Sequence, residues 1–168
     1  FSKENEGLSA TRNFGIRHAS GKYMMYIDSD DKFSPDTVKA VTDFFDKHYN
    51  EVDLVTYLDQ PYKFGKKIKT HYRYQYLKKS GVYSLEEFPY ITQTRVNICV
   101  KNKFENNYLF DTTPGFRLED QEYCSKVLKD KLCIGFCSEG EYQYNRSNDG
   151  SIVSNYFYAY YIFESSMA

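Results

Sequence analysis

The sequence has no tryptophan, no long apolar run and no excess of charge of either sign. Its apolar stretches are far shorter than the roughly 20 residues that a membrane-spanning helix needs, and its first residues lack the pattern of a signal peptide. The formal net charge of −1 gives no global attraction for nucleic acid or another polyanion, so any electrostatic function must be local. These absences favour a globular domain in the cytoplasm, and 168 residues suffice for one domain with a sizeable core.

The four cysteines show no metal-binding spacing. Cys99, Cys124, Cys133 and Cys137 include no C-x2-C pair, which is the spacing of many zinc sites. A cytoplasmic domain also keeps its thiols reduced. We therefore expect mostly buried free thiols, with neither zinc nor disulfides.

Alternating helix and strand signals predict an α/β domain. Apolar residues at helical spacing alternate along the chain with short apolar runs, which are typical of strands buried on both faces of a mostly parallel sheet. The predicted helices cover 8–19, 34–50 and 118–131, and the predicted strands cover 23–27, 53–57, 68–76, 95–100, 132–137 and 141–146.

The second helix has the clearest signals. Ser34 is the predicted N-cap and Pro35 the first helical residue, a position that proline favours. Val38, Val41 and Phe45 then recur at helical spacing, which predicts that all three face the core.

Three carboxylates follow the first predicted strand within four positions. Asp28, Asp30 and Asp31 repel one another at this spacing, which a bound cation would relieve. They stand at the end of a buried strand, where α/β sheets bind ligands, and their hard oxygens suit Mg²⁺ or Mn²⁺. A polar turn, in which Asp31 caps the next segment, explains the same residues. The carboxylates alone leave both interpretations open.

The segment 5–31 resembles a motif of family 2 glycosyltransferases over its whole length. The matching residues at fixed spacing are Asn5, Gly7, Ser9, Arg12, Asn13, Gly15, Ile16, Ala19, Gly21, Tyr23, Asp28, Ser29, Asp30 and Asp31, while Thr11 replaces the usual alanine. The resemblance implies a GT-A fold, in which a Rossmann-like, mostly parallel sheet flanked by helices binds a nucleotide-diphosphate sugar through Mn²⁺ or Mg²⁺. It implies a metal site at Asp30, Asp28 and Asp31, and a donor nucleotide near Arg12, Asn13 and Asp28.

A second acidic pair begins the third predicted helix. Glu119 and Asp120 suit a first helical turn simply through the helix dipole, so their position needs no further explanation. The resemblance implies more, because a pair at this distance faces the acceptor in family 2 enzymes. Asp120 is then the general base of an inverting transfer, and Glu119 orients it or the acceptor hydroxyl.

The segment 142–152 resembles a mobile donor-binding loop of bacterial members of the family. Arg146 and Ser151 would reach the diphosphate from this loop. Asn145 stands where the arginine is more usual, so the register is shifted by one position. An ordinary surface loop explains the segment equally well.

Basic and aromatic residues alternate along 68–76. Such a pattern could bind single-stranded nucleic acid, but a half-exposed edge strand with a solvated basic face needs no ligand. The balanced net charge argues against nucleic acid as a partner. A basic ribbon could also contact anionic acceptor phosphates or the membrane surface.

The resemblance starts inside the third unit of the GT-A fold. We therefore expect one partial domain over 1–168 that is incomplete at its N-terminus, with 1–58 in the donor and metal half and 59–168 in the acceptor half. A bare sheet edge would also favour a homo-oligomer.

The expected activity is sugar transfer from a UDP-sugar to a glycan or lipid-linked glycan of the bacterial surface, of teichoic-acid, capsule or lipopolysaccharide type. We expect it in the cytoplasm, at the inner face of the membrane. A non-catalytic remnant that binds glycan through its tyrosines is the alternative, and a nucleic-acid-binding module is the third hypothesis.

Overall fold

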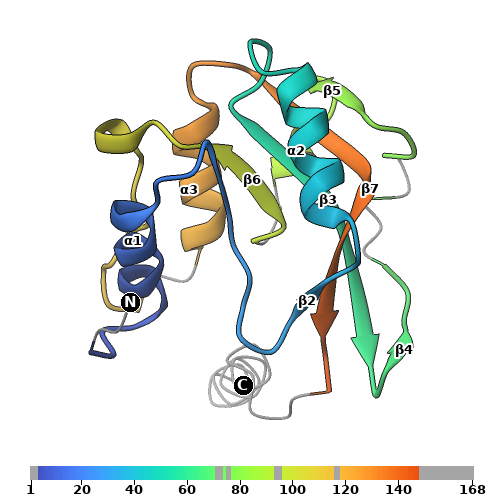
Figure 1. The fold of residues 1–168 in the computed structure, drawn as a ribbon, viewed down its shortest axis with the longest axis horizontal. Coiled ribbons are helices and arrows are strands. Elements are labelled where there is room, and N and C mark those ends of the chain that lie inside the picture. Colours follow the sequence, from blue (N-terminus) through green and yellow to red (C-terminus); the bar gives the residue numbers. More distant parts are fainter. Residues whose placement is uncertain (1–3, 71–73, 75–76, 93–95, 116–117, 148–168) are drawn as a thin grey trace, which may run out of the picture.

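The protein is a mixed β-sheet between two layers of helices (Figure 1). The computed structural model describes residues 4–70, 74, 77–92, 96–115 and 118–147. Its helices are α1 (Leu8–His18), α2 (Thr37–Lys47) and α3 (Glu119–Leu128), with the 3-10 helices η2 (Pro89–Thr92) and η3 (Phe104–Asn106). Its strands are β1 (Tyr23–Met25), β2 (Lys32–Phe33), β3 (Leu54–Lys63), β4 (Lys66–Lys67), β5 (Gly81–Ser84), β6 (Ile98–Lys101) and β7 (Cys133–Asn145). None of the helices in these ranges is long and apolar enough to cross a membrane.

The predicted mostly parallel sheet is wrong. The strands are ordered β1-β6-β3-β7-β2, with β4 beside β3 and β5 beside β7. Of the strand pairs that the structure describes, β3 with β7 is parallel and the others are antiparallel. The short apolar runs did predict burial on both faces correctly, but burial contains no information on strand direction.

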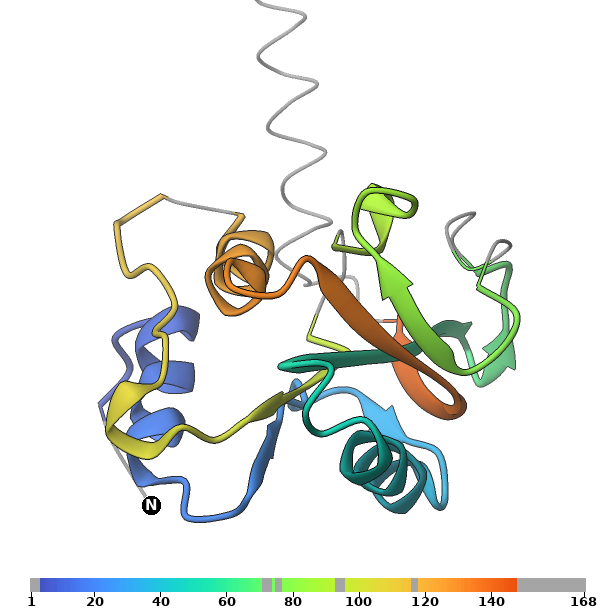
Figure 2. The ribbon, with the colours of Figure 1, turned by 90° about the horizontal axis from the view of Figure 1, so that it is seen from above.

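The core consists of two apolar clusters, one on each face of the sheet. Figure 2 shows α2 and α3 on opposite sides of the strands. Along β3, Leu54 packs in the cluster with α1 and α3, whereas Val55 and Tyr57 pack in the cluster with α2. Successive side chains of a strand point to opposite faces, so β3 contributes to both clusters.

The second helix begins later than predicted. It starts at Thr37, and the predicted N-cap Ser34 instead pairs its hydroxyl with that of Thr37 at 2.7 Å. Val41 and Phe45 are fully buried, as predicted, but Val38 is 52% exposed. The buried stripe follows the spacing of four residues from Thr37 through Val41 to Phe45, so Thr37 takes the inward position expected for Val38.

The last two predicted strands are one continuous strand. In β7, Cys137 lies opposite Tyr57, but the next pair joins Glu141 to Leu58, so 138–140 form a bulge. A Cβ atom on Gly140 would lie 2.6 Å from Cγ2 of Val41, which explains a glycine where α2 approaches β7. The polar residues of this bulge resemble a turn in the sequence, which is why two strands were expected.

The remaining predictions have mixed outcomes. The four cysteines are free and all but Cys133 are buried, which confirms the expected thiols.

Two of the predicted strands differ from the structure. Of the strand expected at 68–76, residues 68–70 are not in a strand, and 71–73 and 75–76 lie outside the described residues. The two lysines of β4 instead pair with the end of β3. The strand expected from 95 begins at Ile98.

Candidate functional site

Arg12 joins the two acidic segments that the sequence singled out. Its guanidinium group points inward from α1, with 8% of the side chain exposed. Nη1 donates to Oδ1 of Asp120 at 2.6 Å, and Nη2 donates to Oδ1 of Asp28 at 3.1 Å. A carboxylate oxygen of Glu119 lies 3.9 Å from Nη1. The structure therefore brings four of the predicted site residues to one place, where α1 meets the first turn of α3.

The guanidinium group of Arg12 rests on an aromatic support. Its central carbon lies 5.2 Å from the ring centre of Phe110, and that ring stacks on Tyr123 of α3 with 4.0 Å between ring centres. A cation over an aromatic face is stabilised, so the support helps to hold Arg12 between its carboxylates. Neither Phe110 nor Tyr123 was predicted as part of the site. Tyr123 lies in the helix predicted at 118–131, but no pattern in the sequence marks it as a neighbour of Arg12.

Asn13 fixes the position of Phe110. Its amide group donates to the backbone carbonyl oxygen of Phe110 at 2.9 Å and accepts from the backbone N–H of the same residue at 2.8 Å. The side chain is buried, and both ends of its amide are used. Asn13 was expected at the donor nucleotide. In the structure it holds the backbone of Phe110, and the ring of Phe110 in turn supports Arg12.

Asp120 is the carboxyl group whose protonation is most altered within the site. The pKa of Asp120 is raised to about 6, chiefly by burial. The positive charge of Arg12 lowers the pKa, and the negative charges of Glu119 and Asp28 add to the increase. A carboxyl group in this range is mostly ionised at neutral pH but holds a proton far more readily than an exposed aspartate does. This is the property that a general base needs.

The three carboxylates after β1 form a tight turn at 28–31, closed by a bond from the N–H of Asp31 to the carbonyl oxygen of Asp28 at 3.1 Å. Asp28 is half-buried and Asp30 is exposed. Asp31 is buried, and its two carboxylate oxygens accept from the Tyr142 hydroxyl at 2.6 Å and from the Asn145 N–H at 2.7 Å. Burial raises the pKa of Asp31, and these two bonds oppose the increase.

Tyr142 ties this turn to β7. Its hydroxyl donates to Asp31 and also accepts from the backbone N–H of Asp28 at 3.1 Å. The residue was not predicted as part of the site, because in the sequence it is one tyrosine among 18 and lies far from the turn. The shape of the 28–31 turn thus depends on the last described strand.

The donor set of the turn fits a divalent cation held together with a substrate. Both oxygens of Asp31 are already bonded, so Asp28 and Asp30 are the carboxylates that could face an ion. Within the ranges that the structure describes, no three His, Cys, Asp or Glu side chains form a group able to hold a metal ion. Mg²⁺ and Mn²⁺ can be bound by one or two carboxylates plus phosphates and water, so two aspartates fit that chemistry.

A cavity of about 610 Å³ adjoins these residues between α1 and β1. Arg12, Asp28 and Ser29 form part of its wall, and the rest includes apolar residues such as Leu8, Ile16 and Met24. The volume is within the range of small-molecule sites, and the wall combines a few polar groups with mostly apolar ones.

The predicted loop residues are only partly described. Arg146 is exposed just beyond the end of β7, where its backbone N–H donates to the carbonyl oxygen of Tyr62 at 2.7 Å. Ser151 lies outside the described residues.

We expect Tyr142→Phe to lower the free energy of unfolding by about 1–3 kcal/mol, because buried Asp31 loses a hydrogen-bond donor. Tyr57→Phe is the matched control. Its hydroxyl is also buried, but it has no hydrogen-bond partner among the residues that the structure describes, so removing it should leave stability unchanged or raise it. Urea unfolding of both variants measures the difference. Equal losses in the two variants would contradict the assigned role of Tyr142.

Comparisons with known proteins place these features in a family. The model of the family described as "Glycosyl transferase family 2" matches residues 1–127. The minor teichoic acid biosynthesis protein GgaB of Bacillus subtilis is 29% identical over 151 residues, which cover 89% of this chain and 16% of GgaB. The related protein GgaA of the same organism is 28% identical over 152 residues, covering 87% of this chain and 33% of GgaA.

A solved structure shares the fold. The crystal structure of Staphylococcus aureus TarS 1-349 in complex with UDP-GlcNAc matches with a TM-score of 0.70 and 18% identity, covering 88% of this chain and 41% of that chain. The chain thus spans less than half the length of these relatives. The family match extends from α1 through most of α3, so it includes Arg12, the 28–31 turn and Asp120. The chain belongs to glycosyl transferase family 2.

Proposed function

We propose that this chain forms part of the catalytic site for transfer of a sugar from a UDP-sugar to a hydroxyl group of a growing teichoic-acid-type surface glycan. The observation that carries the proposal is the bridge that Arg12 makes between Asp28, on the predicted donor side, and Asp120, on the predicted acceptor side. The similarity to GgaB and GgaA supports the teichoic-acid class of acceptor. The fold shared with a TarS structure that contains UDP-GlcNAc supports a UDP-sugar donor.

Asp120 acts as the base. Its carboxylate accepts the proton of the acceptor hydroxyl, while Arg12 holds the carboxylate in place through one of its two oxygens and leaves the other for the acceptor. Glu119 lies beside this pair and orients the hydroxyl. Attack from the face of the sugar opposite the departing diphosphate then gives inversion.

Asp28 and Asp30 would hold Mn²⁺ or Mg²⁺ together with the diphosphate of the donor. The ion supplies stabilisation of the negative charge that develops on the leaving diphosphate. Asp31, bonded through both oxygens, keeps the turn in shape. Arg146 and Ser151 are assigned to the diphosphate as well, and Asn13 acts on the donor side by fixing Phe110 under Arg12.

Thermal unfolding of the full-length protein with UDP, GDP or CDP, each with and without Mn²⁺, tests the donor site. A ligand that binds only the folded state raises its melting temperature, so we expect UDP to do so only when Mn²⁺ is present. Asp30→Asn should abolish the increase. Asp43→Asn, which changes an exposed carboxylate of α2 paired with Lys39, should keep it.

Equal increases with all three nucleotides would contradict the choice of UDP. No increase with any of them would overturn the donor site and favour the non-catalytic glycan-binding role, which is indifferent to Mn²⁺ and to Asp120→Asn.

A further inference from the structure

The hairpin between β3 and β4 exposes a phenylalanine in a backbone conformation that phenylalanine disfavours. Phe64 and Gly65 form its two-residue turn, with φ of 49° and 74°. Two positive φ angles are typical of a type I′ turn, whose first position favours asparagine, aspartate or glycine. Phe64 is 75% exposed, so its ring gains little from packing in return for the strain. Neither backbone conformation nor packing therefore explains a phenylalanine at this position.

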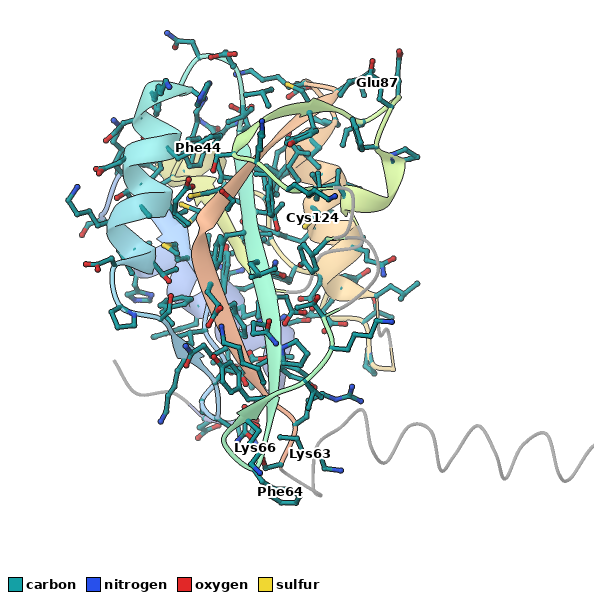
Figure 3. All side chains as sticks on the ribbon, turned by 90° about the vertical axis from the view of Figure 1, so that its right-hand side faces the viewer. Phe44, Lys63, Phe64, Lys66, Glu87 and Cys124 are labelled. Atoms are coloured by element: carbon teal, nitrogen blue, oxygen red, sulfur yellow. The ribbon has the colours of Figure 1, made fainter. Side chains whose placement is uncertain are left out.

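The same hairpin tip carries a concentration of positive charge. Lys63 and Lys66 flank the turn and are exposed, and Figure 3 shows both beside Phe64 at the extreme end of the hairpin. The ammonium group of Lys63 lies 5.6 Å from the centre of the Phe64 ring. No acidic residue occurs in the sequence from 60 to 70. Arg146 is also exposed. It lies next to the hairpin, since its backbone N–H donates to the carbonyl oxygen of Tyr62.

We propose that this tip docks the protein on an anionic lipid bilayer. Phe64 enters the boundary between headgroups and acyl chains, while Lys63 and Lys66 contact the anionic headgroups. An apolar ring with basic neighbours is the combination by which peripheral proteins bind such surfaces. A soluble polyanion would satisfy the lysines but would leave the ring in water, so the bilayer is the partner that uses both parts of the tip.

The docking tip is connected to the candidate site through the end of β7. Asn145 donates its N–H to Asp31 of the 28–31 turn, and two residues later the Ser147 hydroxyl accepts from the N–H of Phe64 at 2.7 Å. In Figure 1 the hairpin with β4 and the segment leading into β2 lie at the same end of the sheet. Docking through Phe64 therefore turns this end, with the 28–31 turn, toward the bilayer.

Co-sedimentation with lipid vesicles tests the proposal without any need for sugar transfer. We expect the chain to bind vesicles of phosphatidylglycerol and phosphatidylcholine, but not vesicles of phosphatidylcholine alone. Phe64→Ala should weaken binding about tenfold. Each lysine near an anionic surface contributes about fivefold, so the double change Lys63→Gln and Lys66→Gln should weaken binding more than tenfold.

Phe104→Ala is the matched control for the ring. Phe104 is 64% exposed and also has a positive φ, of 55°, but it lies between Lys103, whose ammonium group pairs with Asp53, and the acidic Glu105. This variant should bind vesicles like the parent.

Phe64→Asn separates the effect on vesicle binding from the effect on folding, because asparagine suits the first position of this turn. It should raise the melting temperature and still lose vesicle binding.

The proposal fails if Phe64→Ala and Phe64→Asn bind vesicles like the parent, or if Phe104→Ala weakens binding equally. It also fails if the parent binds both kinds of vesicle alike. Inorganic polyphosphate serves as a soluble competitor. If it binds as tightly as the vesicles, and only the lysine changes weaken binding to both, the tip is a surface for soluble polyanions and the assignment to a bilayer is wrong.

Discussion

Replacing Asp120 with asparagine is expected to lower the rate of sugar transfer by about 10²- to 10⁴-fold, which is the usual contribution of a general base. The amide keeps the size of the side chain and can still accept a bond from Arg12, but it cannot take the proton of the acceptor hydroxyl. Initial rates with a UDP-sugar and a glycan acceptor measure the effect. Glu122→Gln is the matched control, because Glu122 lies in the same helix and pairs with Lys126.

The pH profile of the parent gives an independent readout of the same group. Because the pKa of Asp120 is raised to about 6, the parent should lose activity as the pH falls through 6, and it should reach a plateau above that value. The asparagine variant should not show this transition. An unchanged rate in Asp120→Asn, or the same pH profile in both proteins, would show that another group is the base.

Arg12→Gln should lower the free energy of unfolding by about 3–5 kcal/mol at about pH 8. Arg12 is the cation between Asp28 and Asp120, so the change leaves two nearby carboxylates without their shared positive partner. Urea unfolding measures the loss. Lys22→Gln, which breaks an exposed ion pair with Asp46, should change stability by less than about 1 kcal/mol.

The loss in Arg12→Gln should depend on pH in a defined direction. Asp120 has a higher pKa in the folded protein, about 6, than its ordinary value of 3.8, so folding favours its protonated form and stability falls as the pH rises between these values. Without Arg12 the folded pKa rises further. At about pH 5 Asp120 is then protonated and uncharged, and the loss should be smaller than at pH 8.

A double variant completes this test. Arg12→Gln combined with Asp120→Asn should recover part of the lost stability at about pH 8, because the second change removes one of the unpaired charges. An equal loss at both pH values, with no recovery in the double variant, would mean that Arg12 stabilises the fold through packing alone.

Local patterns in the sequence predicted the elements around the site. The helix expected at 8–19 is α1, the strand expected at 23–27 contains β1, and the helix expected at 118–131 contains α3. Each of these predictions rests on residues within one or two helical turns. Arg12, Asp28 and Asp120 were chosen through the family resemblance, and their direct contact adds geometry that the resemblance did not contain.

The contacts that support the site could not be predicted in this way. Asn13 and Phe110 are 97 positions apart, and Asp31 and Tyr142 are 111 positions apart. Periodicity indicates which side chains face the core but not which distant segments meet there. For the same reason the directions of the strands were missed, since a run of buried residues is alike in parallel and antiparallel neighbours.

The sequence distance between the 28–31 turn and β7 also determines when the turn can take its final shape. Tyr142 and Asn145, which hold Asp31, lie 111 and 114 positions after it, so they leave the ribosome long after the 28–31 turn. Contacts between such distant segments form late, because a long loop must close first. A nascent chain that has not yet reached β7 therefore carries Asp28, Asp30 and Asp31 before it has the strand that shapes their turn, and we expect the proposed donor site to form only when β7 enters the sheet.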